Sequence, residues 1–279
     1  MNIQDAVTAH KNYLKTFAKA TSCASYDHLY RFLLQRFPNK TIESFTAQEI
    51  FDFLNDLTKE RSQATRRLRF QQIKSILNFA INNLEIVMKN PCSTPMLSTS
   101  FRAPKHSPRE LIDKEMMDTI IYRTDDSRDR SILELGSRCC MRISEILKLK
   151  PKNVIGTQLI LEQPKSGKDT ETVIMQEKVA QRLQKYIQEK NIQPEEKIFP
   201  ISYSGARSMM NRIQQKFGIK LRLHDLRRFG ATYASRAGVP LEIVSRNLLR
   251  HSDLKISQLY IGASSPAQTQ KWLDTIYER

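Results

Sequence analysis

Residues 140–175 decide the predicted fold and read CMRISEILKLKPKNVIGTQLILEQPKSGKDTETVIM. The first ten residues complete the second of two consecutive helices that the pattern predicts over about 125–150, and a proline ends it. Two short strand-like runs follow, Gln158 to Glu162 and Thr170 to Met175, and the turn residues Pro164-Lys165-Ser166-Gly167-Lys168 lie between them. The stretch predicts a small β-hairpin within a mostly helical domain.

Helical patterns surround this hairpin. Upstream, Asp113 can cap a helix that begins directly after it. Downstream, apolar spacing predicts helices over about 177–190, 203–217, 224–237 and 240–249. Since the chain shows no internal repeat and no low-complexity tract, we expect one mostly helical domain from residue 108 to residue 279.

The first hundred residues also predict helices separated by short polar connections. Thr46-Ala47-Gln48-Glu49 is a capping box, and apolar residues follow it at helical spacing: Ile50, Phe53, Leu54 and Leu57. A second helix is expected from near Ser62 to about Asn83, with one apolar stripe made of Leu68, Ile73, Ile76, Leu77, Ala80 and Leu84. Its first half carries a dense arginine cluster between residues 64 and 70.

The composition changes between the two helical regions. Residues 90–107 hold three prolines, several serines and threonines, and the basic Arg102, Lys105 and His106. Such a segment is typical of an extended linker. We therefore expect a first domain over residues 1–90, a linker over residues 91–107 and a second domain over residues 108–279.

The charge of the chain favours a polyanionic partner. Its 279 residues carry 45 basic and 29 acidic side chains, a formal net charge of +16. Residues 1–105 hold 15 basic and 8 acidic side chains, a charge of +7, which leaves +9 for the rest. Both domains would then face the polyanion as a clamp. A basic surface without a dedicated partner is the alternative on charge alone.

The cysteines and the hydropathy pattern concern the location of the protein. Cys23, Cys92, Cys139 and Cys140 form no CxxC pair and no zinc spacing with the five histidines. Reduced, buried thiols in a cytoplasmic protein are the simplest interpretation. No apolar run approaches the roughly 18 residues of a membrane span, and the N-terminus has no signal-peptide pattern, so we expect no membrane partner.

A polyanion with a phosphodiester backbone raises the question of phosphate chemistry. Cleaving a phosphodiester requires a nucleophile, stabilisation of the charge on the non-bridging oxygens and a proton for the leaving alkoxide. We find no DxD, DDE-like or HNH arrangement that would hold magnesium, and we expect no metal and no cofactor. An arginine-rich site is the alternative, because a guanidinium donates two hydrogen bonds to phosphate and stays charged.

Four segments could supply such a site. They contain Arg142 with Glu145 one turn on, Lys165 at the tip of the hairpin, His224-Asp225-Leu226-Arg227, and Leu249-Arg250-His251 followed nine residues later by Tyr260. Each is weak alone, since an HxxR or RxxE is usually a surface pair and a single histidine is usually structural. Lys168 and Arg138 compete with Lys165 and Arg142, and Tyr260 is one of nine tyrosines.

Taken in order, the four segments resemble the tyrosine recombinase (phage integrase) family. The family pattern reads roughly T-G-[LM]-R-x-S-E-[LI]-x-x-L, a K-[TS]-G hairpin, H-D-L-R, L-G-H-S, and a tyrosine nine residues after the last histidine. This chain departs from it at Cys139-Cys140, which replaces Thr-Gly, and at Arg250, which replaces glycine. A bulky cation at position 250 could alter how tightly the tyrosine segment docks. The first domain looks like the family's helical core-binding (SAM-like) module.

The resemblance implies a site-specific recombinase that needs neither metal nor ATP. Tyr260 would attack the scissile phosphorus and form a 3′-phosphotyrosyl bond, while Arg142 and Arg227 hold the non-bridging oxygens. Lys165 would be the general acid, His224 would take and return the tyrosine proton, and His251 would bond a phosphate oxygen. A type IB topoisomerase-like strand relaxation and a catalytically silent DNA-binding paralogue are the alternatives.

The resemblance further implies double-stranded DNA as partner and a tetramer on two DNA sites. In the first domain, the expected duplex contacts are Arg66, Arg67, Arg69 and Lys74, with a solvated helix face as the alternative. Trp272, Leu273 and Ile276 form a small C-terminal apolar face that either closes its own domain or packs on a neighbouring protomer. The target sequence, and whether the chain resolves dimers or integrates mobile DNA, stay open.

Overall fold

The computed structural model describes residues 1–104, 111–162 and 169–251 of the chain. It divides into two compact units, Met1–Ser107 and Pro108–Arg279, here called unit 1 and unit 2. The described residues are mainly helical with one small antiparallel sheet, as the sequence predicts. No helix within these ranges is long and apolar enough to cross a bilayer.

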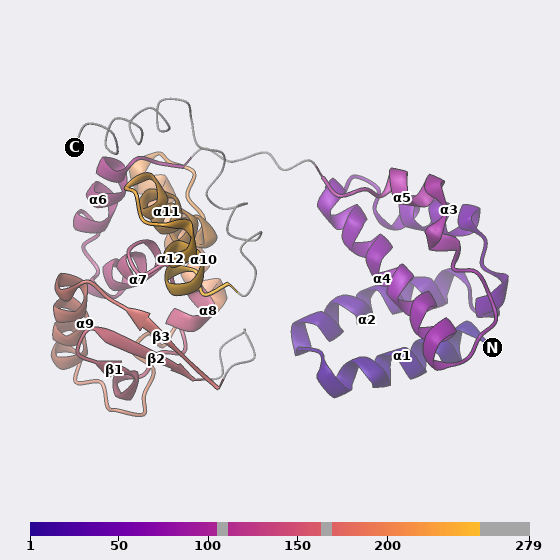
Figure 1. Cartoon of the computed structure of the whole chain (residues 1–279), viewed down its shortest axis with the longest axis horizontal. Helices are drawn as coiled ribbons and strands as arrows, with labels where there is room; N and C mark the ends of the chain where they lie inside the picture. The colour runs from indigo at the N-terminus through magenta and orange to yellow at the C-terminus, as the bar shows by residue number, and fades with distance from the viewer. Residues whose placement is uncertain (105–110, 163–168, 252–279) are drawn as a thin grey trace. The chain divides into compact units, whose positions relative to one another are not determined.

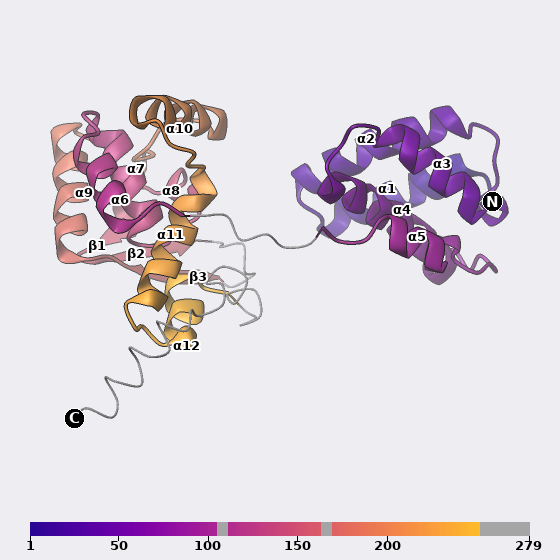
Figure 2. The same ribbon diagram turned by 90° about the horizontal axis from the view of Figure 1, so that it is seen from above.

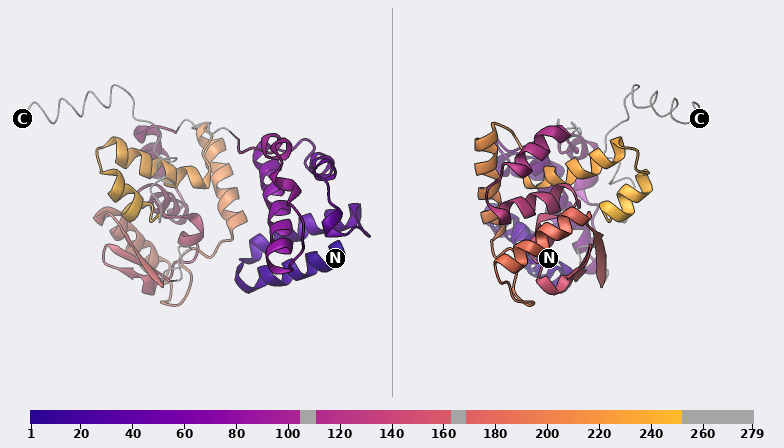
Figure 3. Two further views of the ribbon diagram at one scale, coloured as in Figure 1. Left: turned by 45° about the vertical axis from the view of Figure 1, so that its right-hand side comes forward. Right: turned by 90° about the vertical axis from the view of Figure 1, so that its left-hand side faces the viewer.

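Within residues 1–104, unit 1 has five α-helices: α1 (Ile3–Phe17), α2 (Ala20–Arg36), α3 (Ala47–Leu57), α4 (Gln63–Asn83) and α5 (Pro95–Ser100). The predicted capping box is present, because Thr46 and Glu49 cap α3 reciprocally. Ser62 caps α4, whose start and end match the prediction. α4 packs against α1, α2 and α3 (Figure 3), so the core of the unit lies around this long helix.

The predicted extended linker is wrong for its first eleven residues. Pro91–Ser93 forms a 3₁₀ turn and Pro95–Ser100 forms α5, and the side chains of Cys92, Leu97 and Phe101 are fully buried in the core of unit 1. Proline is well suited to the first turn of a helix, where its missing N–H costs nothing. The prolines therefore begin short helices here, and three apolar side chains anchor them.

The apolar stripe predicted for α4 is also partly wrong. Leu68 is 48% exposed, whereas Phe70, Ile73, Ile76 and Leu77 are buried. Leu68 lies on the exposed side of α4, while the adjacent Arg67 and Arg69 donate to the carbonyls of Phe101 and Ser25, so the buried stripe begins at Phe70.

Unit 2 surrounds α7 with helices and a sheet. Its elements are α6 (Lys114–Tyr122), α7 (Ser127–Ser137), α8 (Ile143–Ile146), β1 (Val154–Ile155), β2 (Gln158–Glu162), β3 (Thr170–Ile174), α9 (Glu177–Glu189), α10 (Tyr203–Phe217), α11 (Leu223–Arg236) and α12 (Leu241–Ile243). Asp113 caps α6 as predicted. A π-helical turn, Val244–Leu248, continues α12 where the sequence predicted one α-helix.

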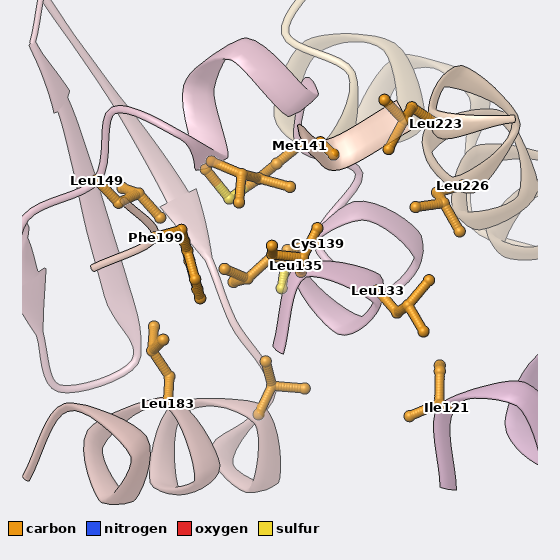
Figure 4. Close-up of a cluster of buried hydrophobic side chains, with 14 of the residues drawn as sticks. Ile121, Leu133, Leu135, Cys139, Met141, Leu149, Leu183, Phe199, Leu223 and Leu226 are labelled. Atoms are coloured by element: carbon orange, nitrogen blue, oxygen red, sulfur yellow. The ribbon is translucent and has the colours of Figure 1, made fainter. Parts of the chain in front are cut away.

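The sheet has three antiparallel strands in the order β1-β2-β3, and Leu159 pairs with Val173. The two-residue β1 escaped prediction because it is too short to show alternation. α7 packs against α9 and α11 (Figures 1 and 2), and its Leu133 and Leu135 are fully buried. Figure 4 shows Leu149, Leu183 and Phe199 gathered beside the sheet within the same core. This core fixes α8, α11 and the loop after α7, which carry the candidate site.

Candidate active site

Arg227 lies at the centre of the site and is only 1% exposed. It projects from the first turns of α11, where the carboxylate of Asp225 accepts the Arg222 backbone N–H at 3.0 Å. Its Nη1 donates to the carbonyl of Cys140 at 2.5 Å, and its Nη2 donates to the carbonyl of Leu249. One guanidinium thus joins α11 to two turns that are distant in sequence.

Arg142 is held by Glu145 at the start of α8. Arg142 Nη1 donates to Glu145 Oε1 at 2.6 Å, and the Arg142 backbone N–H donates to Glu145 Oε2 at 2.9 Å. Burial acts to raise the pKa of Glu145, but the charge of Arg250 and the hydrogen bonds from Arg142 outweigh it and hold that pKa below its ordinary value. The predicted brace is therefore present, with an ionised carboxylate.

His251 lies against Arg227, with His251 Nε2 at 3.3 Å from Arg227 Nη2. Burial, and then the charges of Arg227 and Arg142, lower the pKa of His251 to about 4. The ring is therefore neutral at pH 7. Because a guanidinium can only donate, Nε2 must be the acceptor, which leaves the ring proton on Nδ1 as a hydrogen-bond donor.

His224 lies on α11 one turn before Arg227. Desolvation, followed by the charge of Arg227, lowers its pKa below the ordinary 6.5. A neutral imidazole at pH 7 can accept a proton.

The structure thus brings together four of the six predicted catalytic residues. The charges of Arg227 and Arg142 act on both His224 and His251, which places the four side chains within electrostatic reach of one another. Lys165 and Tyr260 lie outside the described residues. What the cluster offers is two guanidinium groups and two neutral imidazoles, a set suited to holding an anion and moving one proton.

Residues 112–265 match the model of the phage integrase family, a match that spans more than half of the chain. This chain belongs to the phage integrase family of tyrosine recombinases. A tyrosine recombinase of Pseudothermotoga lettingae is 26% identical over 76% of this chain and 76% of its own length. Tyrosine recombinase XerA of Pyrococcus horikoshii is 26% identical over 83% of this chain and 81% of its own length.

Solved structures agree on the fold. The Tn1549 transposon integrase, solved with circular intermediate DNA, superposes with a TM-score of 0.77 at 16% identity, covering 98% of this chain and 99% of that one. A lambda integrase dimer bound to a core site gives a TM-score of 0.74 at 17% identity, over 95% of this chain and 97% of that one.

The recombinase departs from its family pattern at two left-handed backbone positions. Cys140 has φ 52° and Arg250 has φ 50°, and glycine suits this region because it has no Cβ. The Arg250 side chain is buried between Glu145 and Glu171, and its predicted effect on docking of the tyrosine segment concerns residues outside the described ranges. Sequence reasoning missed Glu171, because its partner lies far along the chain.

The arginine cluster of α4 in this recombinase makes contacts within unit 1. Arg66 Nη2 donates to Asn55 Oδ1 at 2.8 Å, Arg67 Nη1 to the Phe101 carbonyl at 3.2 Å, and Arg69 Nη1 to the Ser25 carbonyl at 2.7 Å. These three arginines and Lys74 are all half-buried. Their neutral acceptors leave the positive charges uncompensated, so a role toward DNA stays a prediction.

Sequence reasoning missed a basic pocket in unit 1 of the recombinase. It has a volume of about 780 Å³ and is lined by residues that include His28, Arg36, Arg61 and Arg69. Arg36 ends α2 and Arg61 precedes α4, so no single helical pattern could have grouped them. Among the described residues of both units, no three His, Cys, Asp or Glu side chains gather as a metal site.

Proposed function

We propose that this recombinase cleaves and rejoins double-stranded DNA at specific sites, with Tyr260 as the nucleophile. The observation that carries the proposal is one cluster, in which Arg227 contacts His251 and the turn at Cys140 just before Arg142, with His224 one turn away on α11. Tyr260 follows His251 by nine residues, the interval of the family pattern.

The proposed step balances without a cofactor. The Tyr260 phenolic oxygen forms a bond to the scissile phosphorus, and the bond from phosphorus to the 5′ oxygen breaks. His224 accepts the phenolic proton, and Lys165 donates a proton to the departing 5′ oxygen. Because the 3′-phosphotyrosyl bond replaces a phosphodiester, the reverse attack by a 5′-hydroxyl rejoins the strand without ATP.

The buried cluster supports distinct roles for its members. Arg142, whose side chain is 25% exposed, would meet one non-bridging oxygen, while Arg227 would fix the turns at Cys140 and Leu249 and place its positive charge beside the phosphate. The His251 Nδ1–H would donate to another oxygen. A phenol with an ordinary pKa near 10 would ionise more readily beside these cations.

The partners follow from the same proposal. Double-stranded DNA would be held by both basic units, with Arg66, Arg67, Arg69 and Lys74 as the predicted contacts in unit 1. A tetramer on two DNA sites is the proposed working assembly, since a similar fold is seen in a lambda integrase tetramer bound to a Holliday junction. A cytoplasmic location is proposed because all four cysteines are free.

A covalent capture experiment tests the function and finds the target sequence at the same time. The recombinase is incubated with nicked duplexes of randomised sequence, and DNA that stays attached after denaturation is recovered and sequenced. We expect one enriched sequence for the wild type, none for Tyr260→Phe, and full capture for the control Tyr203→Phe, which alters a 56% exposed tyrosine of α10.

Each other outcome has a defined meaning. Capture that persists in Tyr260→Phe would show that another residue is the nucleophile. Capture without sequence enrichment, together with relaxation of any supercoiled plasmid, would favour the topoisomerase-like alternative. If the wild type captures no DNA at all, the chain is a silent DNA-binding paralogue.

A further inference from the structure

We propose that Arg250 is a positioning residue, whose guanidinium links Glu145, the brace of Arg142, to Glu171 of strand β3 and thereby sets the orientation of Arg142 toward DNA. The proposal rests on the proposed function. It gives a structural role to the side chain of Arg250, at a position where the family pattern has glycine, a residue without a side chain.

The geometry forms one continuous chain of ion pairs. Arg250 Nη2 lies 2.6 Å from Glu145 Oε2, and Arg250 Nε lies 3.3 Å from Glu171 Oε2. The other Glu145 oxygen, Oε1, lies 2.6 Å from Arg142 Nη1. Strand β3, the turn at residue 250 and helix α8 are thus joined through alternating charges.

The backbone conformation shows that this arginine comes at a cost. An L-residue in the left-handed region is less stable than glycine by about 1–2 kcal/mol, and Arg250 has φ 50°. Its side chain is only 4% exposed, so its charge is also taken out of water. Such a side chain is tolerated because its Nη2 donates to Glu145 Oε2 and its Nη1 to the Leu248 carbonyl at 2.9 Å, while the Glu171 carboxylate adds a negative charge 3.3 Å from Nε without a hydrogen bond.

The charge balance explains how Arg250 preserves the positive potential of Arg142. Glu145 and Glu171 are each 8% exposed, and with Arg142 and Arg250 they make a set of two positive and two negative charges. Without Arg250, Glu145 would be neutralised by Arg142 alone, which would leave less positive potential on Arg142 for a phosphate. Glu171 would lose the only cation within 4.0 Å of its carboxylate among the described residues.

The fixed carboxylate of Glu145 also explains how the orientation of the Arg142 side chain is held. Glu145 Oε2 accepts from both Arg250 Nη2 and the Arg142 backbone N–H, so its rotamer is held from two sides. Loss of Arg250 would free this oxygen and let the Glu145–Arg142 pair shift together. An error of about 1 Å at a group that contacts the reacting phosphate can cost on the order of 100-fold in rate.

The test uses the full-length recombinase and a nicked duplex of the sequence that the wild type captures. Single-turnover adduct formation is measured against pH, and the DNA dissociation constant is measured separately. For Arg250→Gly we expect a rate loss of about 30-fold or more with a dissociation constant within threefold of wild type. The acid limb of the pH profile should move to higher pH, because Glu145 loses the cation that lowers its pKa.

Three further variants separate positioning from folding. Arg250→Lys restores the charge, so it should recover the wild-type pH limb and part of the rate. In the double variant Arg250→Gly with Glu171→Gln, no unpaired carboxylate is left at Glu171, so thermal stability should recover while the rate should stay low. Arg246→Ala removes a 68% exposed arginine of the neighbouring π-helical turn and should change neither rate nor pH profile.

Two failures can be told apart. If the wild type forms adduct and Arg250→Gly matches it within twofold with the same pH limb, the role of Arg250 is refuted and the function stands. If the wild type forms no adduct on any duplex, the proposed function falls and the role of Arg250 falls with it. Recovery of the rate in the double variant would show that Arg250 only prevents a folding defect.

Discussion

The arginines of α4 in unit 1 and the arginines of the site in unit 2 differ in what surrounds them. Arg66 and Arg67 are half-buried and donate to an amide oxygen and a backbone carbonyl, so each keeps its full charge near solvent. Arg227 and Arg250 are nearly inaccessible and hold several segments of backbone and two carboxylates. In unit 1 arginine contributes charge, whereas in unit 2 it contributes geometry.

This contrast predicts opposite responses to the same conservative change. Arg227→Lys keeps the charge but can no longer reach both the Cys140 and the Leu249 carbonyls, so covalent adduct formation should fall about 10³-fold. Arg67→Lys, the matched control in unit 1, should retain adduct formation within threefold. An Arg227→Lys enzyme with more than a tenth of wild-type activity would show that charge alone suffices in unit 2.

A second property expected to be specific to unit 2 is the close approach of the α11 backbone to the end of α7. A Cβ added at Gly230 of α11 would lie 2.1 Å from the Ser137 carbonyl oxygen and 2.7 Å from Cys140 Sγ, so Gly230→Ala must separate α11 from α7. We expect unit 2 to lose about 3 kcal/mol of stability. Hydrogen exchange should report faster opening of α7 and α11 peptides and unchanged α1 and α4 peptides.

The control for that change is another glycine of unit 2. At Gly205, in the first turn of α10, an added Cβ meets only ordinary contacts of 3.4 Å and more. Gly205→Ala should be neutral or stabilise the helix by up to about 1 kcal/mol. Equal losses in the two variants would mean that the approach of α11 to α7 is not what limits unit 2.

Local signals predicted the helices well, because they depend on neighbouring residues. Thr46 with Glu49, Ser62 and Asp113 each cap the helix that follows within a few residues; the sequence predicted the first and the last of these caps and a helix start near Ser62. Likewise, the spacing of His224 and Arg227 on one helix predicted that they share a face. The resemblance to the tyrosine recombinase family, and not a local signal, predicted the four residues of the candidate site that the structure brings together.

Long-range pairs could not be predicted in this way. Arg250 donates a hydrogen bond to Glu145, 105 residues away in sequence, and Arg69 donates one to Ser25, 44 residues away. No periodicity records such partners, and the left-handed φ of Arg250 is indicated only by the glycine that the family pattern has at that position. The helices at Pro91–Ser93 and Pro95–Ser100 were missed for a related reason, because their anchors Cys92, Leu97 and Phe101 bury against distant helices.

A buried histidine gives unit 1 its own pH dependence. His10 is 1% exposed, its Nδ1 lies 2.5 Å from the Tyr30 hydroxyl, and burial lowers its pKa from 6.5 to about 4. The unfolded chain therefore binds a proton before the folded chain does, so stability falls as the pH drops from about 6.5 to about 4. Between pH 7 and pH 4.5 the loss attributable to His10 should be about 2 kcal/mol.

The measurement is urea unfolding of wild type and His10→Gln at several pH values, with pulsed hydrogen exchange of α1 and α4 peptides reporting on unit 1. Glutamine can still accept from Tyr30 but does not titrate, so the variant should show a shallower decline in stability toward acid. Parallel pH curves for the two proteins would mean that His10 is solvated in the native state.

The smallest expected effect concerns the charge that unit 1 offers to DNA. If Arg66 and Arg67 contact phosphates, each alanine variant should reduce the slope of log affinity against log salt by about 0.9. Arg69→Ala should reduce the slope in the same way and should also lower stability, because Arg69 Nη1 donates to the Ser25 carbonyl and to Gln72 Oε1 at 2.8 Å. Arg61→Ala tests the basic pocket, since Arg61 is exposed and lines it beside Arg36. A flatter slope for Arg61→Ala with unchanged slopes for Arg66→Ala and Arg67→Ala would move the phosphate contacts from the α4 cluster to the pocket. It would also narrow the contrast between the units, because the half-buried arginines of unit 1 would then serve packing, as the buried ones of unit 2 do.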